Sequence, residues 1–132
     1  MHDEKLNHVR HITKSDIVTV LKIVGNELAY MRKNKGISGA ELGKLLGMSQ
    51  QQISRYENGV TRLDLSTLLS FLLRLDTTLD DFFRHISERL KMYHPMLYIK
   101  YHFIFSSGIT SREISPDDYL KAASTLTMES YS

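Results

Sequence analysis

Ser38–Gly59, SGAELGKLLGMSQQQISRYENG, predicts two short helices joined by a tight turn. Ser38 followed three residues later by Glu41 has the spacing of a capping box, so the first helix is expected to begin at Gly39. Gly47 comes directly after the last apolar residue of that helix, where a left-handed residue commonly ends a helix and turns the chain. The stretch therefore indicates a helix, a glycine turn and a second helix within 22 residues.

The second helix is expected to run from its cap at Ser49 to Asn58. Ile53 and Tyr56 are three residues apart and would face inward, which leaves the polar side chains pointing outward. In the major groove of DNA, glutamine pairs with the edge of adenine and arginine with that of guanine. The expected base-reading side chains are Gln50, Gln51, Gln52 and Arg55, with Gln52 able to reach a base or a phosphate.

Positive charge gathers around this helix pair. Residues 31–63 carry six basic and two acidic side chains, a net charge of +4, whereas residues 64–88 carry two basic and five acidic ones, a net charge of −3. A solvated lysine-rich surface would show the same bias, but here it coincides with the glutamine-rich helix, as phosphate binding requires. The expected phosphate contacts, which set position without reading sequence, are Lys44, Ser49, Asn58, Thr61 and Arg62.

These residues resemble the helix-turn-helix of the Cro and phage-repressor family, also called XRE-type. Gly43 and Gly47 stand where the family has a small helix residue and a turn glycine, and Ile53 and Tyr56 stand at its two buried recognition-helix positions. The resemblance covers about residues 23–86, roughly half of the chain. It implies an all-α fold, a five-helix lambda-repressor-like DNA-binding domain.

The same resemblance assigns roles outside the helix pair. Arg32 stands where relatives have an arginine that pairs with a glutamate placed like Glu57, so the two are expected to form a scaffold ion pair. A helix from Leu65 to Leu75 and another from Leu79 would complete the domain, and we expect their apolar residues to pack its core. Neither helix carries residues to which we assign chemistry.

Two departures from the family bear on affinity. Relatives often have a glutamine at the start of the first helix of the pair, which contacts phosphate and braces the recognition glutamine, but this chain has Gly39 there. The loop after the recognition helix, VTRLDLS (residues 60–66), lacks the usual proline and is lightly basic. Both predict weaker or more degenerate DNA binding. The run SQQQISRYENG further resembles fimbria-operon-encoded regulators of motility and adhesion genes.

The chain extends beyond this domain at both ends. We expect a flexible arm over residues 1–13, the helix-turn-helix domain over 14–93, and an extension over 94–132. Thr13 with Asp16 predicts a capping box and a long amphipathic helix from Lys14 to Asn34. The broad apolar face of that helix is either additional core or a surface for a second subunit.

The extension is expected to contain one strand and a short helix. The last domain helix would run to about Tyr93, where His94-Pro95 breaks it. Met96–Phe105, MLYIKYHFIF, is rich in aromatic and β-branched residues and predicts a strand, and Ser115–Leu126 a helix. A lone strand needs a partner, so we expect the same strand of a second copy and assign dimerisation to this extension. The alternative is a buried irregular segment or a helical extension packed on the domain.

Composition excludes several classes of protein. The 132 residues are 42% hydrophobic and 24% charged, contain no cysteine, and include no apolar run near the ~20 residues that span a bilayer. We therefore expect a cytoplasmic protein with no membrane partner, and zero cysteines exclude disulfides and thiolate chemistry. His8 and His11 lack a third ligand nearby, so no metal site is expected. No phosphate-binding glycine loop, nucleophile elbow or converging carboxylate pair points to an enzyme, a cofactor or a small-molecule ligand.

Two functions remain. The first is a sequence-specific transcriptional regulator that binds double-stranded DNA as a homodimer and, by the narrower resemblance, controls fimbrial and flagellar genes. The second is a protein-interaction module of the antitoxin or anti-repressor type, with weak, non-specific DNA binding. The three glutamines and the arginine favour the first, because a protein-binding module does not need base-reading side chains.

Overall fold

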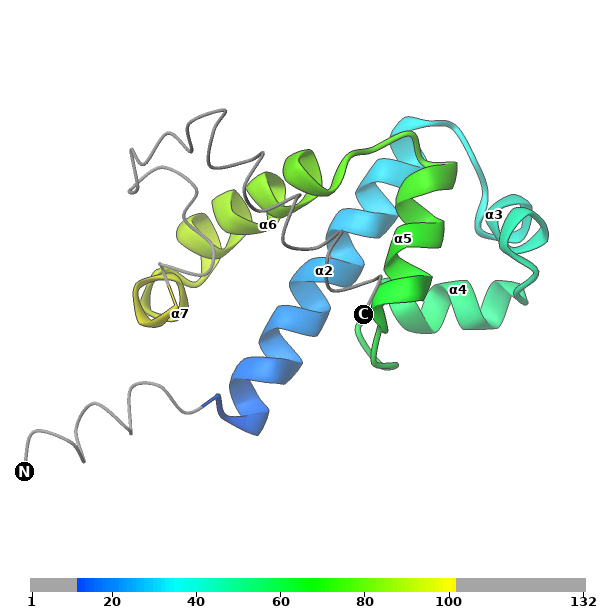
Figure 1. Cartoon of the computed structure of the whole chain (residues 1–132). Coiled ribbons are helices and arrows are strands. Elements are labelled where there is room, and N and C mark those ends of the chain that lie inside the picture. The colour runs from blue at the N-terminus through cyan, green and yellow to red at the C-terminus, as the bar shows by residue number, and fades with distance from the viewer. Residues whose placement is uncertain (1–11, 102–132) are drawn as a thin grey trace, which may run out of the picture.

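Six helices make up the part of the chain that the computed structural model describes, residues 12–101 (Figure 1). Figure 1 shows α2 running through the middle, with α3, α4 and α5 to one side of it and α6 and α7 to the other. None of the helices in this range is long and apolar enough to cross a membrane. In chain order the helices are α2 (Lys14–Asn34), α3 (Gly39–Leu46), α4 (Gln50–Glu57), α5 (Leu65–Arg74), α6 (Leu79–Tyr93) and α7 (Pro95–Lys100).

The amino-terminal capping box is present as predicted, and α2 has the predicted bounds. The Asp16 amide donates to the Thr13 hydroxyl at 3.1 Å, and the Thr13 amide donates to the Asp16 carboxylate at 3.3 Å. Ile23, Leu28 and Met31 of α2 are buried in the core. The long helix therefore contributes to the core of the domain from its middle to its carboxyl-terminal end.

The predicted helix pair is confirmed in detail. Ser38 caps α3 in a reciprocal capping box with Glu41, and Ser49 caps α4. Gly47 ends α3 in the left-handed region at φ 67°. A Cβ added at Gly43 would lie 2.5 Å from the carbonyl oxygen of Met48, so only glycine lets the turn fold back this closely. The glycine pattern thus sets the angle at which α4 leaves α3.

The core is apolar and joins all six helices. Phe71 of α5 and Phe82 of α6 are fully buried, and Ile86 and Leu90 continue the buried stripe of α6. The expectation that every leucine of α5 packs the core was wrong. Leu65, Leu69 and Leu73 are exposed by 66%, 44% and 76%, because their spacing of four forms a separate stripe, about 110° around the axis of α5 from the core residues.

The predicted strand at Met96 was wrong for the described residues, because Pro95–Lys100 form helix α7. Pro95 occupies the first turn, where a missing amide costs nothing and the fixed φ suits a helix. Leu97 and Tyr101 lie four residues apart and are both buried against the domain. The helix satisfies its own backbone, with Tyr101 N donating to Leu97 O at 3.1 Å, so no partner strand is needed. The alternative of a helical extension packed on the domain is confirmed for α7, and the rest of the predicted strand and the helix at Ser115–Leu126 lie outside the described residues.

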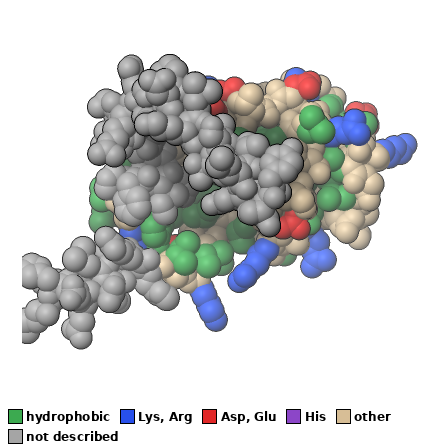
Figure 2. Space-filling model, in the orientation of Figure 1, with side chains coloured by type: hydrophobic (Ala, Val, Ile, Leu, Met, Phe, Trp, Pro, Cys, Tyr) green, Lys and Arg blue, Asp and Glu red, His purple; other side chains and the backbone are tan. Residues whose placement is uncertain are grey.

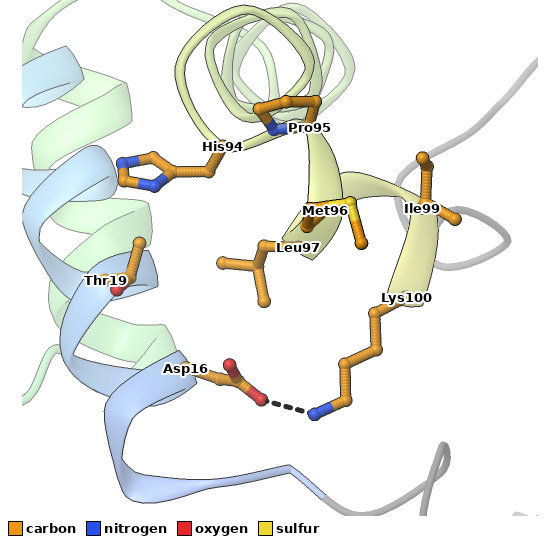
Figure 3. A pocket seen from close by; sticks show the side chains of 8 residues that line it. All are labelled: Asp16, Thr19, His94, Pro95, Met96, Leu97, Ile99 and Lys100. Carbon is orange, nitrogen blue, oxygen red and sulfur yellow. Dashed lines mark hydrogen bonds and ion pairs between the residues drawn. The ribbon is translucent and has the colours of Figure 1, made fainter.

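Helix α7 is fastened to the first turn of α2. Lys100 Nζ and the Tyr101 hydroxyl donate to the same oxygen of Asp16, at 2.9 and 2.7 Å. These two hydrogen bonds hold the pKa of the Asp16 carboxyl well below its usual range. Figure 3 shows Lys100 reaching across to Asp16, with Leu97 pointing into the groove between α7 and α2. One carboxylate therefore both caps α2 and anchors α7.

Candidate nucleic-acid interface

Two inward-facing residues fix the rotation of α4 about its axis. Ile53 is 1% exposed, and the Tyr56 ring meets that of Phe71 edge to face with 5.8 Å between centroids. At 100° per residue, Gln51 and Arg55 lie on the side of α4 opposite to this pair. Both side chains are exposed. Their outward direction is what a helix lying in a DNA groove requires.

The other two glutamines flank this outward face, and Gln52 is engaged within the protein. Gln52 Oε1 accepts from the Ser49 amide at 3.0 Å and lies 3.4 Å from the Ser49 hydroxyl. The Gln52 amide in turn donates to the Ser49 hydroxyl at 3.1 Å, which completes a capping box. In this structure both residues stabilise the start of α4. Of the Gln52 side chain, only the Nε2 group remains for a ligand.

Gly39 leaves space beside Gln50. A Cβ at Gly39 would lie 3.6 Å from Cγ of Gln50, which is ordinary contact. The glutamine side chain therefore passes over the first residue of α3 without a side chain to hold it. A glutamine at this position, as in relatives, would fill the space. In this chain residue 39 has no side chain to brace Gln50.

The residues predicted to bind phosphate surround the outward face of α4. Lys44 on α3, Ser49 at the start of α4, and Asn58 and Arg62 after its end are exposed, and Thr61 is half-buried. Figure 2, seen with Figure 1, shows Lys and Arg side chains projecting along the lower edge of the molecule, below α4 and the amino-terminal half of α2. Basic side chains thus border the glutamine-bearing helix, where the sugar–phosphate backbone would pass.

Arg32 and Glu57 form a bidentate ion pair between α2 and α4. Arg32 Nε and Nη2 donate to the two carboxylate oxygens at 2.5 and 3.1 Å, and the Glu57 hydrogen bonds raise the pKa of Arg32. The third guanidinium nitrogen, Nη1, donates to the carbonyl oxygen of Ile37 at 2.7 Å. Both side chains are close to nine-tenths buried, so the pair fixes α2, the α2–α3 loop and α4 relative to one another.

Comparison with known proteins agrees with this geometry. The family model described as helix-turn-helix matches residues 28–82, from the second half of α2 to the start of α6. Residues 28–82 are a helix-turn-helix domain of the Cro and phage-repressor type. The family assignment made from Ser38–Gly59 is confirmed, and so is an all-α fold.

Two curated relatives and one solved structure resemble the chain. Uncharacterized HTH-type transcriptional regulators from Rickettsia conorii and Rickettsia prowazekii are each 28% identical over 79 residues, which is 59% of this chain. The match spans 63% and 61% of their lengths. The crystal structure of the clp gene regulator ClgR from Corynebacterium glutamicum has a TM-score of 0.55 at 18% identity. The match covers 67% of this chain and 94% of the ClgR chain. At 18% identity the similarity concerns the fold.

Within the helix-turn-helix domain, Ser54 is an outward-facing residue that was not among the predicted site residues. Ser54 lies on the outward side of the recognition helix α4, one position before Arg55, and is exposed. Its hydroxyl accepts a hydrogen bond from Asn58 Nδ2 at 3.2 Å. The helical position relative to Ile53 and Tyr56 would have identified Ser54 as outward-facing, because residues opposite a buried pair point away from the core.

Proposed function

We propose that this chain is a sequence-specific DNA-binding transcriptional regulator that acts as a homodimer. Helix α4 would lie in the major groove, with Gln51 reading adenine and Arg55 able to read guanine. Gln50 and Ser54 would reach flanking positions of the same half-site. Lys44 and Arg62 would bind the phosphates on either side and set the register of α4 without reading bases.

One observation supports this function above all. Gln51 and Arg55 are presented outward on a helix whose opposite side is locked by Ile53, Tyr56 and the Arg32–Glu57 pair. Long polar side chains held on a rigid element lose less conformational freedom on binding than the same side chains on a loop. A protein-interaction module would have no use for this arrangement of base-reading groups.

The proposed homodimer is supported by how little DNA one copy would read. The eight residues of α4 span about 12 Å, about a third of the ~34 Å helical turn of DNA. Two copies about one turn apart would double the number of base pairs read. The strand expected at Met96–Phe105 cannot join the copies through its first five residues, because Pro95–Lys100 form helix α7. The short reach of α4 is therefore what supports the homodimer.

The test is enrichment of genomic DNA fragments by the full-length chain, followed by affinity measurements at two salt concentrations. A regulator should enrich a short inverted repeat with half-sites about 10 base pairs apart. Its affinity for that repeat should exceed that for a scrambled duplex by about 10³-fold, the low end for specific regulators, because Gly39 leaves Gln50 unbraced. Fragments upstream of fimbrial and flagellar genes are the first expected among those enriched, from the narrower resemblance.

Other results would contradict the proposed function or the homodimer. Uniform binding with no enriched motif, and the same salt dependence for every fragment, would refute a sequence-specific regulator. A tight complex with another protein in the same experiment would then favour the antitoxin or anti-repressor type of module. Enrichment of a single half-site instead of an inverted repeat would retain the DNA reader and refute the homodimer.

A further inference from the structure

Helix α2 is in backbone contact with the end of the recognition helix. A Cβ at Gly25 would lie 2.5 Å from the carbonyl oxygen of Tyr56 and closer still to that of Glu57. A Cβ at Gly59 would lie 2.8 Å from the N and Cα atoms of Lys22, and Gly59 has a left-handed φ of 70°. Two glycines, one on each side of the contact, thus bring one turn of α2 against the end of α4.

This contact places Lys22 beside residues already expected to bind phosphate. Gly59, whose backbone touches that of Lys22, is the neighbour of Asn58 and is two residues from Thr61. Lys22 lies three residues before Gly25 and so on nearly the same side of α2, the side that faces α4. The Lys22 side chain is exposed, and its four-carbon stem can carry the ammonium past the loop.

The charge of Lys22 is available to a ligand. Among residues 12–101 no carboxylate forms an ion pair with Lys22. The acidic side chain that ends α4, Glu57, is held by Arg32. Figure 2 shows that the basic lower edge continues from α4 onto the amino-terminal half of α2, the half in which Lys22 lies. The positive edge therefore extends beyond the helix pair.

We propose that Lys22 binds a DNA phosphate, so that α2 extends the DNA contact of the helix-turn-helix domain. The inference rests on the proposed function, since it needs DNA seated on α4. The ligand is the anionic backbone, and Lys22 would add affinity and no sequence preference. Gly25 and Gly59 act as positioning residues for this contact, because they set the distance between α2 and the end of α4.

Lys33 supplies a matched control on the same helix. It lies eleven residues after Lys22, which is about three turns, so both side chains leave α2 on nearly the same side. The separation along the axis is about 16 Å, and Lys33 is exposed in the last turn, near the α2–α3 loop. Lys22→Gln and Lys33→Gln therefore remove the same charge from the same helix at different distances from the loop after α4.

The experiment measures the affinity of the full-length chain for a random-sequence 20-base-pair duplex and for the enriched repeat, across salt concentrations. One lost phosphate contact flattens the slope of log K against log salt by about 0.9. If that contact contributes nothing at 1 M salt, Lys22→Gln should weaken binding about 8-fold at 0.1 M and about 15-fold at 0.05 M, equally for both duplexes. Lys33→Gln should lower affinity less than Lys22→Gln does and leave the slope nearly unchanged, and Lys22→Arg should restore both affinity and slope.

Each result decides between the two proposals. If Lys22→Gln binds as tightly as the wild type, or loses no more affinity than Lys33→Gln does, the assignment of Lys22 alone is overturned. A loss confined to the enriched repeat would also overturn it, since Lys22 would then be reading bases. No salt-sensitive binding by the wild type to either duplex would overturn the proposed function and this inference together. Thermal unfolding of each variant identifies a loss of DNA affinity that comes from misfolding. If Lys22→Gln is misfolded, Lys22→Arg is compared with the wild type in its place.

Discussion

Gly25→Ala tests the close backbone approach between α2 and the end of α4. In an ordinary helix interior, replacing glycine by alanine stabilises a protein by about 1 kcal/mol. At Gly25 the new methyl group would meet the carbonyl oxygens of Tyr56 and Glu57, the former at 2.5 Å. Because both obstacles are backbone atoms at the end of α4, no side chain can rotate away to make room.

The magnitude follows from the movement required. Relief of the clash needs α2 and α4 to separate by about 0.5–1 Å, which forfeits a quarter to a half of each dispersion contact between them. Overpacking of this kind costs about 1–3 kcal/mol, and two backbone obstacles place Gly25 near the upper end. After the gain of about 1 kcal/mol in helix propensity, the net loss should be about 2 kcal/mol. For a domain of this size that lowers Tm by about 8–16 °C.

The assay is urea and thermal unfolding followed by far-ultraviolet circular dichroism, with Gly39→Ala as the control. A methyl group at Gly39 would lie 3.6 Å from Gln50 Cγ, so Gly39→Ala should leave stability unchanged or raise it slightly. The midpoint should fall for Gly25→Ala with no change in slope against urea. If Gly25→Ala were as stable as the wild type, α2 and α4 would not be in backbone contact, and the positioning of Lys22 would lose its basis.

Three further predictions concern the ion pair, the α7 anchor and base reading. Arg32→Ala should lower the free energy of unfolding by about 2–4 kcal/mol in urea titrations, because Glu57 is left buried without its partner. Asp16→Asn should lower Tm at pH 7, and the difference from wild type should shrink as pH falls below about 4. The Asp16 pKa is lowered chiefly by Lys100, so its stabilisation exists above the unfolded-state pKa and is lost as the carboxylate protonates. Gln51→Ala should lower affinity for the enriched repeat by about 1–3 kcal/mol and relax preference at one base pair, measured by competition with single-base variants.

The controls separate these effects from general damage. A double variant lacking both members of the Arg32–Glu57 pair should recover part of the stability lost in either single variant, and full additivity would contradict a coupled pair. For Asp16→Asn, a Tm difference that persists unchanged down to pH 2 would show that the carboxylate charge is not what anchors α7. For Gln51→Ala, unchanged preference at every base pair would mean that another face of α4 reads DNA.

Local signals predicted the helix pair because each boundary depends on residues near in sequence. Ser38 with Glu41, and Gly47 after an apolar run, specify capping and a left-handed turn whatever surrounds them. The outward direction of Gln51 also followed from local spacing, since Ile53 and Tyr56 fix the buried side. The engagement of Gln52 with Ser49 is the same capping chemistry, which recurs at three helix starts in residues 12–101.

The errors arose where distant contacts decide the conformation. Met96–Tyr101 has the composition of a strand, but Pro95 starts a helix and the i, i+4 pair Leu97 and Tyr101 buries against the domain. Burying two side chains on one helical face requires no second chain, whereas a strand would have needed one. The tertiary partners therefore override a weak local preference, as they commonly do for β-propensity.

A long-range ionic cluster likewise escaped local reasoning. Glu27 of α2 is 2% exposed and accepts from Arg89 Nε at 2.5 Å, with His85 Nδ1 at 2.9 Å. These partners lie 62 and 58 residues away in sequence, so no spacing rule relates them. Nothing in the local pattern distinguishes Glu27 from the solvated charges of an amphipathic helix.

Helix α2 contacts three other helices at different points along its length. Asp16 in its first turn holds α7, Gly25 near its middle touches α4, and Glu27 holds α6. Because one continuous helix of about 16 Å joins these contacts, we expect a change in the seating of α6 or α7 to shift the turn of α2 that touches α4. A shift of only a few tenths of an ångström matters there, since the Gly25 and Gly59 contacts leave no slack for a methyl group. On the proposed function, the placement of α4 in the groove would thus depend on residues of α2, α6 and α7 that lie outside the helix pair.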